Sequence, residues 1–196
     1  MRLYLASISD VKPAHIKMIR PERKKKAERY RREDDQKRCV LGGLLMRDFL
    51  GDVRVFENEN GKPVAENGAC FNLSHSGDYV LFAIGEFQVG CDIERLKAVP
   101  CEKMGRVVFC ENEMNKIKNS PDKTGEFFRL WTKKEALLKC MGEGFHRPAK
   151  SVDVSGDRFE ENGLVYRLKT YEFSDYIISV CTLGGEFADE LEFIRY

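Results

Sequence analysis

The sequence predicts an α+β fold in which helices and strands recur in two halves of the chain. Short apolar runs with period-two alternation, such as Val89–Lys97, indicate strands. Longer segments whose apolar residues share one helical face, such as Glu33–Leu50 and Gly125–Cys140, indicate helices between them. An Asn-Gly pair in each half, at Asn60 and Asn162, is typical of a hairpin turn.

In the first half, a strand over Arg2–Ser7 precedes two helices. The first helix is basic and begins near Pro21, since proline suits the first helical turn. The second helix, Glu33–Leu50, has one apolar face. Strands are then expected over Val53–Glu57, before the Asn60-Gly61 turn, and at the runs that start at Phe71, Tyr79 and Val89.

The second half is expected to begin at the Val99-Pro100 junction, which gives halves of residues 1–99 and 100–196. A helix over Cys101–Lys118 precedes the Gly125–Cys140 helix. Gly142 and Gly144 follow that helix, as glycine often does at a helix end. The remaining expected elements are strands over Arg158–Glu160, Leu164–Leu168 and Ile177–Cys181.

The composition narrows the class of protein. At 196 residues and 42% hydrophobic, the chain can bury a proper core, and its net charge of +1 gives no global field for nucleic acid. No apolar run approaches a membrane span, and Leu3–Ile8 is too short for a signal peptide core. Seven cysteines without a C-x-x-C pair suggest neither a disulfide framework nor a zinc site, so we expect a reducing cytoplasm.

Positive charge is concentrated in one segment, Arg20–Arg32, which holds eight basic residues against Glu22 and Glu28. A charge run of this kind is often a solvated helix face. It is also suited to an anionic ligand or partner. The sequence alone leaves both interpretations open.

Two acids lie on one face of the strand that starts at Val89. Asp92 and Glu94 are two residues apart, so they project to the same side, whereas Val89, Cys91 and Ile93 face a core. Neighbouring carboxylates are destabilising without a cation, and Mg²⁺ is commonly bound by carboxylates together with phosphate oxygens and water. A lone D-x-E pattern also fits a solvated strand face.

The segment Phe127–Gly144 places Trp131, Glu135 and Lys139 on one helical stripe. At about 100° per residue, positions i, i+4 and i+8 drift by only about 80°. A surface Glu–Lys pair is one interpretation. A buried edge is the other, and there both charges would need partners.

The run Phe71–Gly85 contains Ser74, His75 and Ser76 where the chain reverses. A simple hairpin turn is one interpretation. A Ser–His nucleophile is rejected, because adjacent residues of a strand point to opposite faces and no G-x-S-x-G elbow surrounds either serine. A phosphate clamp of hydroxyls, backbone N–H groups and an imidazolium is the remaining functional interpretation.

Four motifs occur in order: GKP at Gly61–Pro63, FNLSHSGDYV, GCDIE and WTKKEALLKCMGEG. Together they resemble the motif set of the Sfp-type 4′-phosphopantetheinyl transferases. The resemblance implies two similar α/β halves, related by a pseudo-twofold, with the active site between them. It also implies Mg²⁺-dependent transfer of 4′-phosphopantetheine from coenzyme A to a serine of an apo carrier protein, with release of 3′,5′-ADP.

The resemblance also implies roles for individual residues. Asp92, Glu94 and Glu135 would hold Mg²⁺ against the pyrophosphate, and Lys139 would contact the same phosphates. The matches for nucleotide binding are Ser74, His75 and Lys62, with Arg23, Lys26 and Arg38 chosen as the phosphate-binding basic residues of the amino-terminal part of the chain. Glu113 matches a second acidic position, and the serine proton could go to Glu135, to Glu113 or to a metal-bound water.

Two other functions are possible. A Mg²⁺-dependent nuclease would also use clustered acids, a lysine and a basic helix, but the near-neutral charge argues against it. A non-catalytic module that binds carriers or coenzyme A would need no acidic cluster. We expect a monomer, with no nucleic-acid or membrane partner, because two halves in one chain complete the site. Fatty-acid, polyketide and nonribosomal-peptide carriers all stay open.

Overall fold

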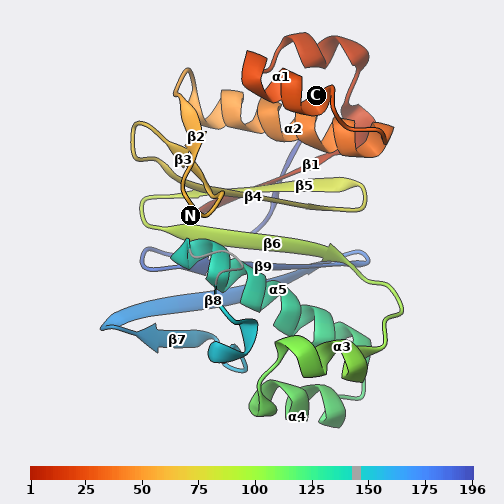
Figure 1. Cartoon of the computed structure of the whole chain (residues 1–196), viewed down its shortest axis with the longest axis vertical. Coiled ribbons are helices and arrows are strands. Elements are labelled where there is room, and N and C mark those ends of the chain that lie inside the picture. Colours follow the sequence, from red (N-terminus) through yellow and green to blue (C-terminus); the bar gives the residue numbers. More distant parts are fainter. Residues whose placement is uncertain (143–146) are drawn as a thin grey trace.

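The computed structural model describes residues 1–142 and 147–196 and has five α-helices and ten strands there (Figure 1). The first half runs β1 (Arg2–Ser7), α1 (Pro21–Ala27), α2 (Glu33–Leu50), β2 (Val55–Glu57), β3 (Pro63–Ala65), β4 (Cys70–Ser76) and β5 (Tyr79–Gly85). The second half runs β6 (Val89–Arg95), α3 (Cys101–Val108), α4 (Glu111–Asn119), α5 (Lys123–Met141), β7 (Arg158–Glu161), β8 (Leu164–Phe173), β9 (Tyr176–Thr182) and β10 (Glu192–Ile194). Short 3₁₀ turns cover Ile8–Asp10, Pro13–Lys17 and Ala149–Ser151.

Both halves have the same topology, which confirms the predicted pseudo-twofold. In the first half, β1 is followed by α2 and the β4–β5 hairpin, and β1 pairs antiparallel with β5. In the second half, β6 is followed by α5 and the β8–β9 hairpin, and β6 pairs antiparallel with β9. The sheet orders are β10-β1-β5-β4 and β6-β9-β8-β7.

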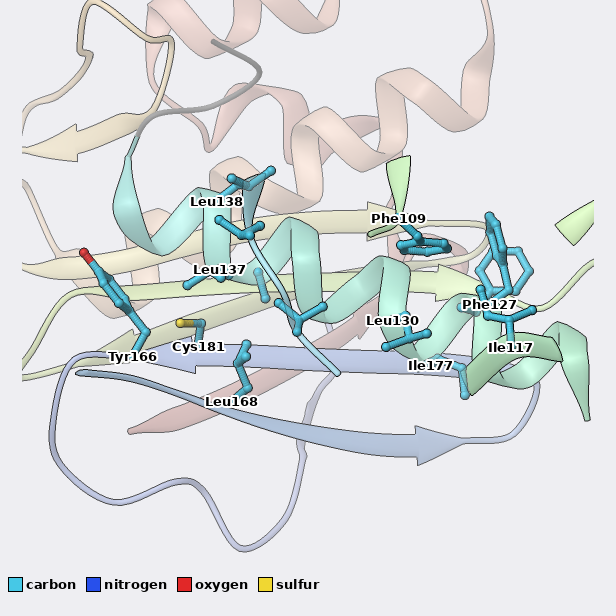
Figure 2. Packing of buried hydrophobic residues seen from close by; sticks show 14 of the residues in the cluster. Phe109, Ile117, Phe127, Leu130, Leu137, Leu138, Tyr166, Leu168, Ile177 and Cys181 are labelled. Atoms are coloured by element: carbon cyan, nitrogen blue, oxygen red, sulfur yellow. The ribbon is translucent and has the colours of Figure 1, made fainter. Parts of the chain in front are cut away.

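The alternation of side chains along the strands gives four layers. One face of the first sheet packs against α2, and its other face meets the second sheet through Leu5, Leu81 and Ile93. The far face of the second sheet packs against α5, and Figure 2 shows Leu130 and Leu137 of that helix above β8 and β9. The helices therefore lie on opposite sides of the paired sheets.

The two sheets meet along β4 and β6, their edge strands, through side chains. The Oγ atoms of Ser74 and Ser76 donate to Asp92 and Glu94 at 2.7 and 2.8 Å. The Asn72 amide oxygen accepts from the backbone N–H of the residue before Asp92 at 3.0 Å. These three hydrogen bonds follow one another in the same order along both strands, so β4 and β6 run in the same direction. The predicted serine turn and the predicted acidic strand are therefore neighbours.

Several predicted elements differ from the structure. The single helix expected over Cys101–Lys118 is wrong, because the chain is extended at Phe109 and restarts as α4 at Glu111. Glu113 causes the break, since its carboxylate accepts the N–H of Cys110 at 2.8 Å and caps the new helix. Two short strands, β3 and β10, were not predicted, and β8 runs five residues beyond the predicted end at residue 168.

Helix α5 ends as predicted at its first glycine. Gly142 has φ of 78°, the left-handed conformation that favours glycine after a helix. Gly144, the second glycine of that prediction, lies outside the described residues. The division at Val99-Pro100 stays a prediction. Hydrogen bonding groups β6 with the second sheet and β10 with the first, so the two sheets share segments across that point.

Candidate active site

The centre of the acidic group is Asp92, on β6 at the seam between the sheets. Its side chain is 7% exposed. Oδ1 accepts from the Ser74 hydroxyl at 2.7 Å and from the Lys139 ammonium at 2.6 Å. Oδ2 is buried and has no hydrogen-bond partner among the described residues. A buried carboxylate oxygen without a donor costs free energy unless a ligand meets it.

Glu94 and Glu135 complete the acidic group. Burial raises the pKa of Glu94, although the hydrogen bond from Ser76 lowers it, and the charge of Asp92 raises it again. Burial also raises the pKa of Glu135, which Lys139 lowers and the charges of Asp92 and Glu94 raise. The charges of neighbouring carboxylates therefore disfavour the ionised forms of Glu94 and Glu135.

Lys139 lies among these acids, which makes the simple surface-pair interpretation of its stripe wrong. Its ammonium donates to Asp92, to the Ser74 hydroxyl at 3.2 Å and to the Cys91 carbonyl at 3.2 Å. Burial lowers the pKa of Lys139, but attraction to Asp92 outweighs this and the pKa is raised. Lys139 is therefore a fixed cation beside the orphaned Asp92 oxygen.

Gly90 allows the helix to reach the acidic strand. A Cβ atom at Gly90 would collide with the carbonyl oxygen of Ala136 and with the backbone N of Cys140. Any other residue would push α5 away from β6. The glycine of the GCDIE motif thus positions Glu135 and Lys139 beside Asp92.

A basic cavity lies on the other side of β4, against α1 and α2. Its volume is about 110 Å³, and its lining includes Arg23, Lys26, Arg38 and His75, the four cationic residues predicted for the nucleotide phosphates. Tyr30, Asp35 and Cys39 complete the lining. The predicted basic residues, which come from separate parts of the sequence, therefore meet in one place.

Three of the cations in the basic cavity already have a partner within the protein. Arg23 donates to the Cys39 carbonyl at 3.0 Å, and its guanidinium lies across Gly42, where a Cβ would be 2.6 Å away. Lys26 pairs with an exposed glutamate at 3.3 Å. Arg38 donates to the Gly77 carbonyl at 2.8 Å. Each of these cations is therefore held in position before any ligand arrives.

Adjacent residues of β4 face the two sites. Ser74 pairs with Leu81 on the face toward the second sheet, whereas His75 pairs with Val80 on the face toward α2. The side chain of His75 is accessible at the cavity rim. Partial burial, followed by the charge of Arg38, lowers the pKa of His75. The imidazole is therefore neutral at pH 7 without a ligand, and Ser74 is part of the acidic site.

Lys62 and Glu113 lie outside both groups. Lys62 reaches the last turn of α5, where its ammonium donates to the Cys140 carbonyl at 3.4 Å, and burial lowers its pKa. Glu113 is completely buried and pairs with Lys134 at 2.8 Å. It also accepts the N–H of Val154 at 2.9 Å in addition to capping α4. These partners give Glu113 a structural role, and its role as a proton acceptor stays a prediction.

The sequence analysis did not select two residues, Ser76 and Lys134, that make buried or partly buried polar contacts in the structure. It did not select Ser76 as a site residue, although the spacing of 18 residues to Glu94 repeats that between Ser74 and Asp92. It also did not select Lys134, whose ammonium is buried and donates to two backbone carbonyls besides Glu113. No sequence pattern distinguishes this buried lysine from its partly buried neighbour at position 133.

Two family models together match most of the chain. The 4′-phosphopantetheinyl transferase N-terminal model matches residues 9–86, and the 4′-phosphopantetheinyl transferase superfamily model matches residues 88–181. The acidic strand β6 and the helix α5 fall in the second match, whereas β4, the other strand of the seam, falls in the first. In the part of the chain that the structure describes, none of the helices is both long and apolar enough to cross a membrane.

Individual relatives extend over nearly the whole chain. The 4′-phosphopantetheinyl transferase gsp of Aneurinibacillus migulanus is 33% identical over 84% of this chain and 76% of its own length. The transferase psf-1 of Bacillus pumilus is 32% identical over 91% and 87%, respectively. The chain therefore belongs to the 4′-phosphopantetheinyl transferase family. Within that family it is of the Sfp type, since the transferase Sfp of Bacillus subtilis matches 92% of this chain and 89% of its own length at 29% identity.

Proposed function

We propose that the chain transfers 4′-phosphopantetheine from coenzyme A to a serine of an apo carrier protein, and that Asp92, Glu94 and Glu135 hold the Mg²⁺ ion that the reaction uses. The observation that carries the proposal is the buried Oδ2 of Asp92, which has no partner among the described residues. Two further carboxylates with raised pKa values face the same place. Hard oxygen ligands of this kind suit Mg²⁺.

The residues at the seam fit phosphoryl transfer, in which positioning and charge neutralisation carry most of the catalysis. Mg²⁺ supplies charge neutralisation and polarisation of the pyrophosphate when it is bound. Lys139, held by Asp92 and Ser74, adds a fixed positive charge on the side where the 3′,5′-ADP leaving group develops negative charge. Ser74 and Ser76 orient the two acids of β6 by donating to them.

Glu135 is the best-supported acceptor for the proton of the incoming serine. Its carboxylate is close enough to Asp92 and Glu94 to feel their charges, so it lies at the proposed metal site, where the serine hydroxyl would have to arrive. Glu113, the other candidate carboxylate, is bound to Lys134 and to two backbone N–H groups. A metal-bound water is the alternative, and replacement of Glu135 by Gln tests both roles at once.

The basic cavity would hold the 3′-phosphate of coenzyme A. Its cations lie on one side of β4 and the acids on the other. One strand thus separates the proposed site of the terminal phosphate from the proposed site of the pyrophosphate. A phosphate dianion would attract a proton to His75 and add its charge to those of Arg23, Lys26 and Arg38. Lys62 is proposed to lie near the nucleotide from the β2–β3 side.

We also propose a partner, an oligomeric state and a cellular location for the chain. An acidic carrier protein would meet the basic segment Arg20–Arg32, and the chain would act as a monomer because one chain contributes both halves of the site. Seven free cysteines suit a reducing cytoplasm. Fatty-acid, polyketide and nonribosomal-peptide carriers are all possible substrates.

The test is a mass measurement. The chain is incubated with coenzyme A, an apo carrier protein and either Mg²⁺ or excess chelator, and the carrier is weighed. We expect one phosphopantetheine increment per carrier with Mg²⁺ and none with chelator. No increment with several unrelated carriers would contradict transfer, and an undiminished increment with chelator would contradict the metal assignment. Cleavage of DNA or RNA by the same preparation would instead favour the nuclease.

A further inference from the structure

The basic cavity contains one acid whose position needs an explanation. Asp35 lines the cavity together with Arg23, Lys26, Arg38 and His75. A carboxylate in a site for a phosphate dianion repels the ligand, and simple attraction would be stronger without it. The acid is therefore expected to contribute something other than its charge.

The contacts of Arg38 indicate what that contribution is. Asp35 Oδ1 accepts from one terminal nitrogen of Arg38 at 2.6 Å, and the Gly77 carbonyl accepts from its Nε at 2.8 Å. The two residues are three apart on α2, so they share a helical face. These contacts use two of the five N–H groups of the guanidinium. The group is thus held at two points, on its own helix and on the β4–β5 turn.

The β4–β5 turn, which holds the guanidinium of Arg38 at the second point, is itself held in place. The turn carries Gly77 at φ of 52°, and the Tyr176 hydroxyl accepts the N–H of Asp78 at 3.0 Å. The side chain of Arg38 is 16% exposed, so little space is open to other rotamers. Removal of the Asp35 contact would leave a guanidinium held by a single hydrogen bond to the turn.

We propose that Asp35 is a positioning residue for donor specificity, which directs the Arg38 guanidinium toward the 3′-phosphate of coenzyme A. This inference rests on the proposed function of the cavity. Its consequence is that the acceptor oxygen of Asp35, rather than its negative charge, carries the effect. Asn at this position keeps an acceptor of the same shape, whereas Ala removes both the acceptor and the charge.

The experiment compares Asp35→Ala and Asp35→Asn with the wild type. Asp34→Asn is the matched control, since Asp34 is exposed on the same helical turn and does not line the cavity. Each protein is assayed for kcat and KM with coenzyme A and with 3′-dephospho-coenzyme A. Thermal melting of each variant reports its folding separately.

We expect Asp35→Ala to lower the preference for coenzyme A about tenfold, through KM for coenzyme A, as for loss of one partly screened charge-assisted contact. The kinetics with 3′-dephospho-coenzyme A should not change. Asp35→Asn should keep at least the wild-type preference. The inference is overturned if Asp35→Ala keeps or increases the preference, which would mean that charge decides. It is also overturned if Asp35→Asn loses as much as Asp35→Ala.

The pH profile gives a readout that a merely structural role would not move. His75 lines the cavity with Arg38 and Asp35 of α2 and with Arg23 and Lys26 of α1. The charge of Lys139, on the other side of β4, also lowers the pKa of His75, and Asp35 is the charged group that raises it. Both Asp35 variants should therefore shift the rise in KM for coenzyme A to lower pH, and Asp34→Asn should not. An unshifted profile in both Asp35 variants would overturn the placement of Asp35 beside the phosphate site.

Failure of this inference is distinguishable from failure of the proposed function. If the wild type transfers phosphopantetheine equally well from both donors, the assignment of the cavity to the 3′-phosphate falls, and the inference falls with it. If the wild type prefers coenzyme A and Asp35→Ala behaves like the control, the cavity assignment stands and Asp35 has no positioning role.

Discussion

The acidic seam and the basic cavity differ in how far the protein itself satisfies their charges. At the seam, Asp92 keeps one buried oxygen without a partner among the described residues, and two more carboxylates have raised pKa values beside it. In the cavity, Arg23, Lys26 and Arg38 each already have an acceptor. The protein itself therefore leaves the acids of the seam less satisfied than these cations of the cavity. Changes at the seam should therefore cost the most activity.

The largest expected effect is that of Asp92→Asn. Asparagine keeps an oxygen for Ser74 and Lys139 and replaces only the orphaned Oδ2 by an NH₂ group, which cannot bind a cation. We expect kcat/KM to fall by at least about a thousandfold, or about 4 kcal/mol of transition-state stabilisation. The assay is carrier mass gain at several Mg²⁺ concentrations.

Glu190→Gln is the control for loss of an exposed carboxylate. Its activity should match that of the wild type, and both variants should melt near the wild-type temperature. Near-normal turnover by Asp92→Asn with the usual Mg²⁺ dependence would remove the metal assignment. It would also remove the contrast between the two sites.

The second largest effect is expected at Lys139. Lys139→Ala removes the fixed cation beside Asp92, so it should lower kcat about a hundredfold while changing KM for coenzyme A much less. Lys139→Arg should rescue poorly, because three acceptors at 2.6–3.2 Å fit a compact ammonium rather than a planar guanidinium. Steady-state kinetics decide the matter. A rise in KM alone would make Lys139 an anchor for the ground state.

Part of the acidic seam could be predicted from the sequence. Asp92 and Glu94 share a strand face, and Glu135 and Lys139 share a helix face, because regular elements have fixed periods. Their meeting across Gly90 could be expected only from the family resemblance, since periodicity does not say which helix covers which strand. The hydrogen bonds from Ser74 and Ser76 to the acids of β6 could not be predicted in the same way, because they form only where the edges of the two sheets come together.

The cavity was less predictable for a physical reason. Arg23, Arg38 and His75 come from two helices and a strand, and no periodicity relates them. Glu113 shows a different limit, because the sequence does not reveal that this acid is a buried cap that binds Lys134. The split of the predicted Cys101–Lys118 helix follows from the same cap. A glutamate looks the same in a sequence whether it caps a helix or takes part in catalysis.

An intermediate effect is expected in the cavity with Arg38→Ala. If the cavity holds the 3′-phosphate, the wild type should prefer coenzyme A to 3′-dephospho-coenzyme A by at least about a hundredfold, since charge-assisted contacts contribute roughly 1.5–3 kcal/mol each. Arg38→Ala should remove at least about tenfold of this preference. The ratio of kcat/KM for the two donors is the measurement. Equal use of both donors by the wild type would assign the cavity to another ligand.

A smaller effect should appear as proton uptake when coenzyme A binds. The pKa of His75 lies below its usual value of 6.5 in the free protein, and a phosphate dianion beside it would raise that pKa. Between the two pKa values, binding takes up a proton. Calorimetry in two buffers with different ionisation enthalpies measures this uptake, and His75→Asn should reduce it. Equal uptake by the wild type and His75→Asn would place the phosphate away from His75.

The smallest expected effect concerns the exposed cations outside the cavity. Lys25 and Arg29 are exposed in the basic segment, and neither lines the cavity. Exposed charges steer an acidic partner, but they act through solvent and are screened beyond about 8 Å at physiological salt. Replacing both by Glu should therefore raise KM for the carrier a few-fold and leave kcat and KM for coenzyme A unchanged. Added salt should reduce the difference from the wild type.

Lys118→Glu is the control, because Lys118 is equally exposed on α4 in the other half of the molecule. If this single replacement raised KM for the carrier as much as the double replacement did, the carrier would dock on the second half. If KM for the carrier stayed flat in every variant and at every salt concentration, charge would not guide the encounter. The basic segment would then serve the nucleotide alone, and both proposed charge sites would belong to the same small substrate.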